Sequence, residues 1–317
     1  MENTGSAKWP PMDPTLRRLL DETAAEDDTP GTGPDVAAMR ADHSNQVLRF
    51  TPEQTRKPAL FEKRGFTGRN GDRIPARVYR SADDDGSPKP TVLWLHGGGW
   101  VTGDLDTADP AAREITAHGA VVVVPDYRRA PEHRFPAAVE DCVDALAWVH
   151  DNVADLGGVT TAIGVGGDSA GGNLSAVLAQ QTDQRSGVLG GQMLVYPMMD
   201  ARTDVGPYPS RADTDRQPVF ALTDVERVVG LYLTDPDSVR DPLVSPILTE
   251  DLTGLAPAVL VSCGHDTLWD EDIAYANALA RAGVPVTHFA DPSLSHGVLD
   301  MIGSVPRARH LMTRAIR

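Results

Sequence analysis

Short apolar runs alternate with longer amphipathic stretches along most of the chain. The runs lie at 91–95, 121–124, 162–165, 193–196, 259–262 and 286–289. The amphipathic stretches lie at about 108–118, 136–152, 170–182 and 270–282 and have the period of helices. Strands that are apolar at almost every position are typical of parallel sheets with both faces buried. The pattern therefore predicts an α/β fold, with helices on both faces of a mostly parallel sheet.

A hairpin is predicted before these runs. Its strands lie at 61–67 and 73–80 and flank Asn70-Gly71, a dipeptide that favours tight hairpin turns. Because a hairpin is antiparallel, the sheet is expected to be mixed and to have about eight strands.

Two helices are predicted ahead of the first strand. The first spans about 14–25, because Asp13 and Pro14 together form a helix-start signal. The acidic segment 26–31, which contains Pro and Gly, is expected to end it. The second follows Asp35 and reaches about residue 48. We expect these helices to form an attachment that is separate from the core.

The alternation is interrupted between Pro197 and Pro257. This segment holds polar loop residues and one predicted helix at about 223–233. An insertion of this size in a compact domain is more typical of a functional lid than of a bare loop. We expect its apolar side chains to contribute to a pocket beneath the lid. They include Met198, Met199, Tyr208 and Phe220.

Charge narrows the range of functions. The 317 residues include 29 Lys and Arg against 45 Asp and Glu, for a net charge of −16. This charge disfavours binding to nucleic acids and to anionic membrane surfaces. It is compatible with a protein that acts on neutral or cationic small molecules. No nucleic-acid or membrane partner is therefore expected.

The sequence also predicts a cytoplasmic protein. The N-terminus lacks a basic segment followed by an apolar run, which a secretory signal would have. No apolar stretch approaches the ~18 residues that a membrane-spanning helix needs. Cys142 and Cys263 are too few for a disulfide framework, and we expect both to be buried and reduced.

The strongest chemical signal is the G-x-S-x-G motif Gly167-Asp168-Ser169-Ala170-Gly171. An apolar run precedes it and a helix-forming stretch follows, which is the context in which this motif forms a sharp strand-to-helix turn. The glycines leave room for the turn, and the turn raises the serine hydroxyl into the cleft at the carboxyl edge of the sheet. The motif predicts Ser169 as a nucleophile. The alternative is an ordinary glycine-rich turn.

A second signal is the sequence HGGGW at 96–100, directly after the apolar run at 91–95. Consecutive glycines let the backbone approach a ligand closely and present N–H groups to it. With the N–H of Ala170, these donors are expected to hold the oxyanion of a tetrahedral intermediate. The alternatives are a flexible loop and a phosphate site, but a phosphate loop usually adds a Lys at G-x-x-x-x-G-K-S/T spacing.

A serine nucleophile needs a base, and the base needs a carboxylate that orients it. In this strand–turn–helix architecture the chain order is Ser, then Asp or Glu, then His. Asp266 follows the run at 259–262, and His296 follows the run at 286–289. Both positions fall at the ligand-binding edge of an open α/β sheet. We therefore predict Asp266 and His296 as the partners of Ser169.

The competing histidines and acids are expected to have structural roles. His96 is expected to brace its loop, and His288 lies within a predicted strand. His265 adjoins Asp266, so the two cannot readily face each other, and His310 lies near a chain end that we expect to fray. The acids that open the next helix are expected to interact with its dipole. They are Asp270, Glu271 and Asp272.

Neither a metal nor a cofactor is expected. Nine histidines are present, but no H-E-x-x-H or similar ligand spacing occurs. Gly164 and Gly166 begin a G-x-G pattern, but Ser169 stands where a dinucleotide-binding motif has its third glycine.

With these residues, the chain resembles the hormone-sensitive-lipase-like branch of the α/β-hydrolases, the bacterial carboxylesterase group. The resemblance covers about residues 90–300. The shared motifs are HGGGW at 96–100, DYRRAPE at 126–132, GDSAGG at 167–172, DPLVSP at 241–246, DTLWDE at 266–271 and SHG at 295–297. Several motifs in the right order make the resemblance specific.

The resemblance implies a role for each candidate residue. Ser169 corresponds to the nucleophile, His296 to the base and Asp266 to the residue that orients it. It implies backbone amides as oxyanion donors, at Gly98, Gly99 and Ala170. It also implies a helical cap, built from N-terminal helices at about 1–60 and an insertion at about 198–235, over a catalytic domain at 61–317.

These observations predict serine-dependent hydrolysis of carboxylic esters with short- to medium-chain acyl groups, through an acyl-enzyme. The substrate is a small molecule, and the protein is expected to be a monomer or homodimer. One alternative is a specialised natural-product hydrolase, such as an O-deacetylase, lactonase or thioesterase. Others on the same fold are a non-hydrolytic lyase or cyclase and a ligand-binding protein.

Overall fold

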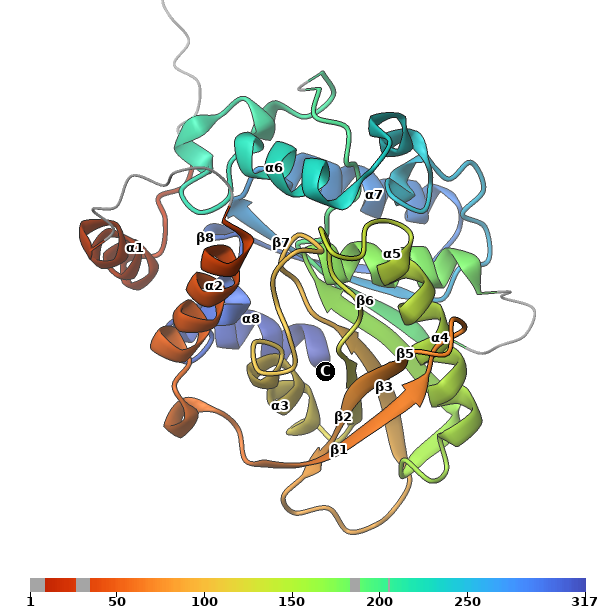
Figure 1. Cartoon of the computed structure of the whole chain (residues 1–317). Coiled ribbons are helices and arrows are strands. Elements are labelled where there is room, and N and C mark those ends of the chain that lie inside the picture. The colour runs from red at the N-terminus through yellow and green to blue at the C-terminus, as the bar shows by residue number, and fades with distance from the viewer. Residues whose placement is uncertain (1–8, 27–34, 183–188, 205) are drawn as a thin grey trace, which may run out of the picture.

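Eight strands form one mixed sheet in the computed structural model, in the order β1-β2-β4-β3-β5-β6-β7-β8 (Figure 1). β1 pairs antiparallel with β2 and β2 pairs antiparallel with β4, while the other neighbours are parallel. The predicted hairpin and mostly parallel sheet are therefore confirmed. The strands are β1 (Ala59–Thr67), β2 (Arg73–Ser81), β3 (Lys89–Leu95), β4 (Val121–Pro125), β5 (Gly158–Asp168), β6 (Gly191–Val195), β7 (Ala258–His265) and β8 (Val286–Ser295).

The structure describes residues 9–26, 35–182, 189–204 and 206–317. Of the segment expected to end the first helix, only Glu26 is among them. The predicted cap regions also include residues outside this set, at 1–8, 27–34 and 205. Within the described part of the chain, no helix is both long enough and apolar enough to cross a bilayer.

Helices cover both faces of the sheet (Figure 1). The valines of β4 alternate between the faces, as side chains of a strand do. Val121 and Val123 pack with residues of α4 and α5, whereas Val122 and Val124 pack with residues of α3 and α8. The helices are α1 (Pro14–Glu26), α2 (Val36–Phe50), α3 (Asp109–Thr116), α4 (Ala137–Asn152), α5 (Ala170–Gln181), α6 (Leu222–Tyr232), α7 (Trp269–Arg281) and α8 (Pro306–Ile316).

Helix α8 contradicts the prediction of a frayed C-terminus. Its apolar side chains, Leu311 and Met312 among them, are buried against the sheet, while His310 faces solvent. The helix is stable because its apolar face completes the core on the side of β7 and β8. The segment is polar on average, so its composition alone does not reveal that face.

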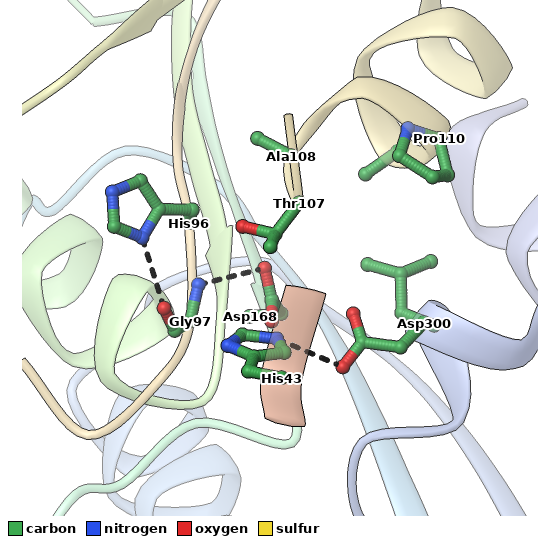
Figure 2. Close-up of a pocket in the computed structure, with 10 residues that line it drawn as sticks. His43, His96, Gly97, Thr107, Ala108, Pro110, Asp168 and Asp300 are labelled. Carbon is green, nitrogen blue, oxygen red and sulfur yellow. Dashed lines mark hydrogen bonds and ion pairs between the residues drawn. The ribbon is translucent and has the colours of Figure 1, made fainter. Parts of the chain in front are cut away.

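The two N-terminal helices are also part of the core, so the expectation of a separate attachment is wrong. Asp13 caps α1 as predicted, because its Oδ1 accepts from the N–H groups of Thr15 and Leu16. Leu16 of α1 and Phe50 of α2 are buried in the cluster that contains Leu311. Helix α2 passes along the edge of the site region, where His43 lies beside Asp300 (Figure 2).

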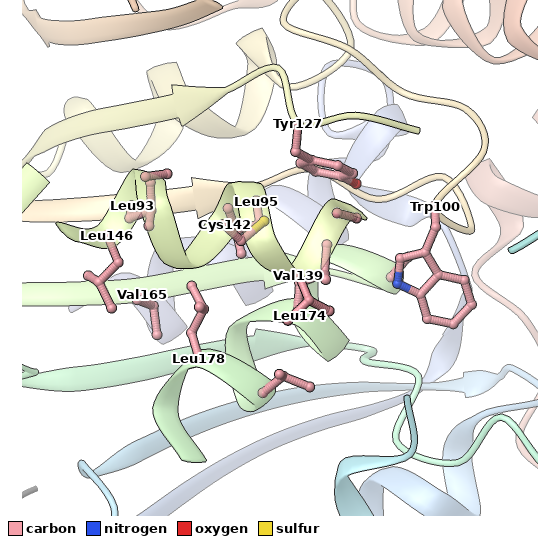
Figure 3. Packing of buried hydrophobic residues seen from close by; sticks show 14 of the residues in the cluster. Leu93, Leu95, Trp100, Tyr127, Val139, Cys142, Leu146, Val165, Leu174 and Leu178 are labelled. Atoms are coloured by element: carbon pink, nitrogen blue, oxygen red, sulfur yellow. The ribbon is translucent and has the colours of Figure 1, made fainter. Parts of the chain in front are cut away.

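The core between the sheet and helices α4 and α5 fixes the position of the turn at Ser169. Leu93 and Leu95 of β3 and Val165 of β5 pack with Leu174 and Leu178 of α5 (Figure 3). Burying each such side chain contributes about 1.5–3 kcal/mol. Since this packing holds α5 against β3 and β5, the turn that joins β5 to α5 has a single position.

The insertion lies between β6 and β7, and its predicted helix is α6. Figure 1 shows α6 crossing above the sheet. Tyr232 at the end of α6 stacks on Trp100 of the HGGGW loop, with ring centroids 4.3 Å apart and an interplanar angle of 6°. The insertion is therefore docked directly on the loop that follows β3.

Gly171→Ala is expected to destabilise the fold by roughly 3 kcal/mol or more. A Cβ at this position would lie 1.9 Å from the carbonyl oxygen of Leu95, so α5 and β3 would have to separate. Gly230→Ala is the matched control, because the added Cβ in α6 meets no atom within 4 Å beyond its chain neighbours and the adjacent backbone of the helix. It should stabilise the protein by up to ~1 kcal/mol. Thermal unfolding measures both, and a wild-type Tm for Gly171→Ala would contradict this packing.

Candidate active site

Ser169 occupies the turn between β5 and α5. Its backbone has φ +52° and ψ −117°, a conformation that costs a non-glycine residue of order 1–3 kcal/mol. Its N–H donates to the carbonyl oxygen of Val195 at 2.9 Å, and α5 begins at the next residue. The turn places Ser169 in the lining of a cavity at the carboxyl end of the sheet.

The structure brings the three predicted residues Ser169, His296 and Asp266 together in one hydrogen-bonded chain. Nε2 of His296 lies 2.9 Å from Oγ of Ser169, and Nδ1 of His296 lies 2.8 Å from Oδ2 of Asp266. A carboxylate only accepts, so Nδ1 carries a proton and Nε2 is left to accept from the serine hydroxyl. All three side chains are buried.

Each member of this chain follows a different strand. Ser169 follows β5, Asp266 follows β7 and His296 follows β8, and all three strands are parallel. The other oxygen of Asp266 accepts from the N–H of Leu268 at 2.9 Å, which fixes the carboxylate. Segments about 100 residues apart in the chain therefore meet because the strands share one edge.

The charges around Ser169, His296 and Asp266 make His296 a stronger base. Burial alone would lower the pKa of His296, because a buried cation is poorly solvated. The adjacent carboxylate of Asp266, together with those of Asp168 and Asp300, outweighs burial. The pKa of His296 is therefore raised above its ordinary value of 6.5.

The predicted oxyanion donors lie beside Ser169. Gly98 and Gly99 line the same cavity as the serine. Ala170 is the first residue of α5, so its N–H is among those with no acceptor inside the helix. Gly98 has φ +110°, and a Cβ there would lie 2.5 Å from Oγ1 of Thr102. The loop therefore turns back sharply at Gly98, beside the cavity that Ser169 also lines.

His96 lies under this loop and not in the serine–histidine chain. Its ring stacks on Tyr127 at a centroid distance of 4.2 Å, and its Nδ1 lies 2.9 Å from the carbonyl oxygen of Gly97. The hydroxyl of Tyr127 donates to the carbonyl oxygen of His96 at 2.7 Å. Burial lowers the pKa of His96 to about 3, so the ring is neutral. These contacts brace the loop.

Asp168, the residue before the serine, binds the start of the same loop. Its Oδ1 accepts from the N–H of Gly97 at 3.2 Å (Figure 2). Burial raises the pKa of Asp168 to about 7, and the nearby carboxylate of Asp300 adds to the increase. Asp168 therefore holds the HGGGW loop against the turn that carries Ser169.

The acids at the start of α7 do more than interact with its dipole. Glu271 is fully buried, and its Oε1 accepts from the N–H groups of Met199 and Asp200 at 2.7 and 3.2 Å. Its other oxygen pairs with Arg211. Asp270 accepts from the N–H of Ser210. The helix-dipole interpretation is therefore incomplete, because these carboxylates hold the insertion in place.

A cavity of about 370 Å³ opens over Ser169. Phe220 of the insertion stacks on the ring of His296, with centroids 4.6 Å apart. Val228 of α6 and Met39 of α2 also line the cavity. The expectation that Met198, Met199 and Tyr208 line it with Phe220 is wrong, because these three pack elsewhere in the interior.

Three residues near the site carry no local sequence signal. His43, Tyr196 and Asp300 all line the cavity, and Tyr196 contacts the His296 ring at a centroid distance of 4.9 Å. They come from α2, from the end of β6 and from the turn after His296. No group of three or more potential metal ligands occurs in the described ranges.

Comparison with known proteins identifies the family. A family model described as the α/β-hydrolase fold matches residues 92–300. The carboxylesterase NlhH of Mycobacterium tuberculosis is 36 % identical over 313 residues, covering 97 % of this chain and 95 % of NlhH. The carboxylic ester hydrolase LipN of the same organism is 38 % identical over 311 residues, covering 92 % and 77 %. A structure of an esterase from Pyrobaculum calidifontis matches with a TM-score of 0.88 at 34 % identity, covering 97 % of each chain.

The chain therefore belongs to the α/β-hydrolases and, within them, to the hormone-sensitive-lipase-like carboxylesterases. The resemblance inferred from the motifs and the predicted fold class are both confirmed.

The pH dependence of activity tests the role of Asp266. Because only neutral imidazole can accept a proton, kcat/KM should rise with pH through the pKa of His296, with a midpoint above 6.5. Asp266→Asn should lower kcat about 10⁴-fold and move this midpoint to lower pH, since the carboxylate that raises the pKa is gone.

The matched control is Asp270→Asn, which alters a neighbouring acid that binds Ser210. Its midpoint should equal that of the wild type in a pH–rate profile with p-nitrophenyl acetate. An unchanged midpoint in Asp266→Asn, or an equal loss of rate in Asp270→Asn, would contradict the assignment.

Proposed function

We propose that Ser169, His296 and Asp266 hydrolyse carboxylic esters through an acyl-enzyme intermediate. The observation that carries this proposal is the buried hydrogen-bonded chain that links the three residues and ends at the floor of the cavity. Family membership supports the same reaction class, because the chain is a carboxylic ester hydrolase by its relationship to NlhH and LipN.

In the proposed first step, Nε2 of His296 takes the hydroxyl proton of Ser169 as Oγ attacks the ester carbonyl carbon. Asp266 holds the imidazole and stabilises the imidazolium. Backbone N–H groups of Gly98 and Gly99, with that of the first residue of α5, receive the negative oxygen. Loss of one such donor costs roughly 2.7–4 kcal/mol of transition-state stabilisation. The imidazolium then protonates the departing alcohol, which leaves an acyl group on Oγ.

Water completes the proposed cycle. His296 takes a proton from water as the water oxygen attacks the acyl carbonyl carbon, and the same backbone donors hold the second oxyanion. The intermediate collapses with Oγ of Ser169 as leaving group, and the imidazolium returns the proton to it. The carboxylic acid is released. All these steps use side chains and backbone of the chain itself, so the proposal includes no cofactor.

The size of the cavity favours short- to medium-chain acyl groups. Its volume of about 370 Å³ lies near the lower end of the ~300–1,000 Å³ that small-molecule sites occupy. Phe220, Val228 and Met39 give it apolar walls near the serine. Long acyl chains would have to extend past the charged side chains of Asp42 and Arg227, which also line the cavity.

We further propose that the segments at about 1–60 and 198–235 form a cap over the catalytic domain at 61–317. Lining residues contributed by both segments support this division, since Met39 comes from α2 and Phe220 from the insertion. A cap that supplies cavity walls restricts which esters reach Ser169.

We propose a cytoplasmic location, with a monomer or homodimer acting on small-molecule esters. Cys142 and Cys263 are both buried and unpaired, as expected in a reducing compartment.

Hydrolysis of p-nitrophenyl esters from acetyl to dodecanoyl tests this function. We expect kcat/KM to peak at short to medium chains. Ser169→Ala should retain less than about a thousandth of the wild-type kcat while keeping the wild-type Tm. Ser238→Ala, which removes a hydroxyl in the 3₁₀ turn Pro236–Arg240, is the control and should be fully active.

Two results would contradict the proposal. Retention of more than about a thousandth of kcat in Ser169→Ala would exclude this serine as the nucleophile. No serine-dependent hydrolysis at any chain length would point instead to a specialised natural-product ester or to ligand binding.

A further inference from the structure

Helix α2 contacts both loops that the proposed reaction needs. One is the oxyanion loop, residues 97–103, and the other is the histidine loop, residues 296–301. We infer that His43 of α2 is a positioning residue that sets the oxyanion loop relative to His296. This inference rests on the proposed function, because it concerns the alignment of the oxyanion donors with the base.

The contact with the oxyanion loop is direct. Nδ1 of His43 lies 2.9 Å from Oγ1 of Thr102. That hydroxyl donates to the carbonyl oxygen of Gly98 at 3.1 Å, and the N–H of Thr102 donates to the same oxygen at 2.8 Å. His43 is therefore one hydrogen bond away from the residue that orients the peptide between Gly98 and Gly99, whose N–H is a proposed oxyanion donor.

The contact with the histidine loop is equally direct. Nε2 of His43 lies 3.2 Å from Oδ2 of Asp300, and Asp300 is only four positions after His296. The N–H of Asp300 donates to the carbonyl oxygen of Gly297 at 3.1 Å, so the carboxylate is tied to the turn beside the base. Figure 2 shows the His43 ring next to Asp300 at the edge of a small enclosed space that Asp168 also lines.

Both ring nitrogens of His43 have a partner. Nδ1 faces Oγ1 of Thr102, a hydroxyl that can donate to the ring or accept from it. Nε2 faces a carboxylate, which only accepts, so Nε2 carries a proton. The His43 ring therefore links the two loops.

The charges around His43 favour the protonated ring. Burial lowers its pKa, but the nearby carboxylates, that of Asp300 foremost, together outweigh burial and the pKa is raised above 6.5. Asp168 at the end of β5 and Asp104 after the oxyanion loop act in the same direction. His96 also faces this region and is neutral because burial lowers its pKa to about 3.

Separate contacts anchor α2, so His43 is not needed to attach the helix. Arg40, one turn earlier, donates to the carbonyl oxygens of Val101 and Ala130 at 2.9 and 3.0 Å and pairs with Glu132 at 2.7 Å. Thr51, at the end of the helix, donates to the carbonyl oxygen of Asp300 at 2.6 Å. With both ends of α2 held, His43 occupies a fixed point between the two loops.

The test compares kcat and KM of His43→Phe and Thr102→Val with wild type on a short-chain p-nitrophenyl ester. His43→Phe removes both hydrogen bonds of the ring, whereas Thr102→Val removes the one from the ring to the oxyanion loop together with the hydroxyl's own bond to Gly98. We expect each to lower kcat roughly 10- to 100-fold with KM changed less than about threefold, because a small misplacement of reacting groups affects the transition state most.

The double variant and a partial replacement add readouts that a purely structural role would not move. In the double variant, His43→Phe should slow Thr102→Val by less than it slows the wild type, because the two side chains share one contact. His43→Asn, whose amide can donate to Thr102, should recover part of kcat. Asn45→Ala, an exposed change on the same helix, is the control and should match wild type.

Circular dichroism and Tm establish that each variant is folded. Should His43→Phe fail to fold, Thr102→Val decides the question, because it replaces a hydroxyl with a methyl group of similar shape. A folded variant of either kind with kcat within twofold of wild type would overturn the inference. An inactive wild type would overturn the proposed function instead.

Discussion

The close approach of α5 to the carboxyl end of β3 is the constraint on which the site depends. Gly171 packs so tightly on the carbonyl oxygen of Leu95 that no side chain fits between them. This contact forces the chain through a sharp turn at Ser169, where the backbone takes a strained positive φ. The apolar packing of α5 on β3 and β5 outweighs that strain. The proposed nucleophile is therefore held by the core and needs no rearrangement before the proposed reaction.

Two kinds of interaction then organise the loops around this turn. Parallel strands deliver Asp266 and His296 to the same edge as Ser169, and hydrogen bonds align them. Other hydrogen bonds hold the oxyanion loop in place. Asp168 binds its first residue, and His43 of α2 binds its other end. The site therefore contains more buried charge than the proposed reaction itself uses. Much of that charge holds backbone segments in place.

Local patterns in the sequence predicted the parts of the molecule that local chemistry determines. The apolar runs, the Asn70-Gly71 turn and the Asp13 cap each correspond to an observed element. The motifs around Ser169 and His296 predicted residues that the structure places within hydrogen-bond distance, because strand order and chain order are linked in this fold. Helix α8 was missed because its buried face is sparse and its exposed face is basic.

Contacts between distant side chains could not be predicted from the sequence. His43 meets Asp300 across 257 positions, and Glu271 reaches the loop after β6 across about 70. Neither residue type nor spacing signals such pairs, since they follow from how whole elements dock. The same reason explains why Phe220 lines the cavity while Met198 and Met199 pack into the interior.

Covalent labelling of the wild type with a p-nitrophenyl alkylphosphonate, followed by mass spectrometry of the intact chain and its peptides, identifies the nucleophile. A phosphonate of this kind reacts with a serine that is activated by an adjacent base and stays attached to it. We expect one adduct per chain, located on Ser169, with p-nitrophenol released in equal amount. Labelling of a different residue, or no labelling of an enzyme that still hydrolyses esters, would contradict this expectation.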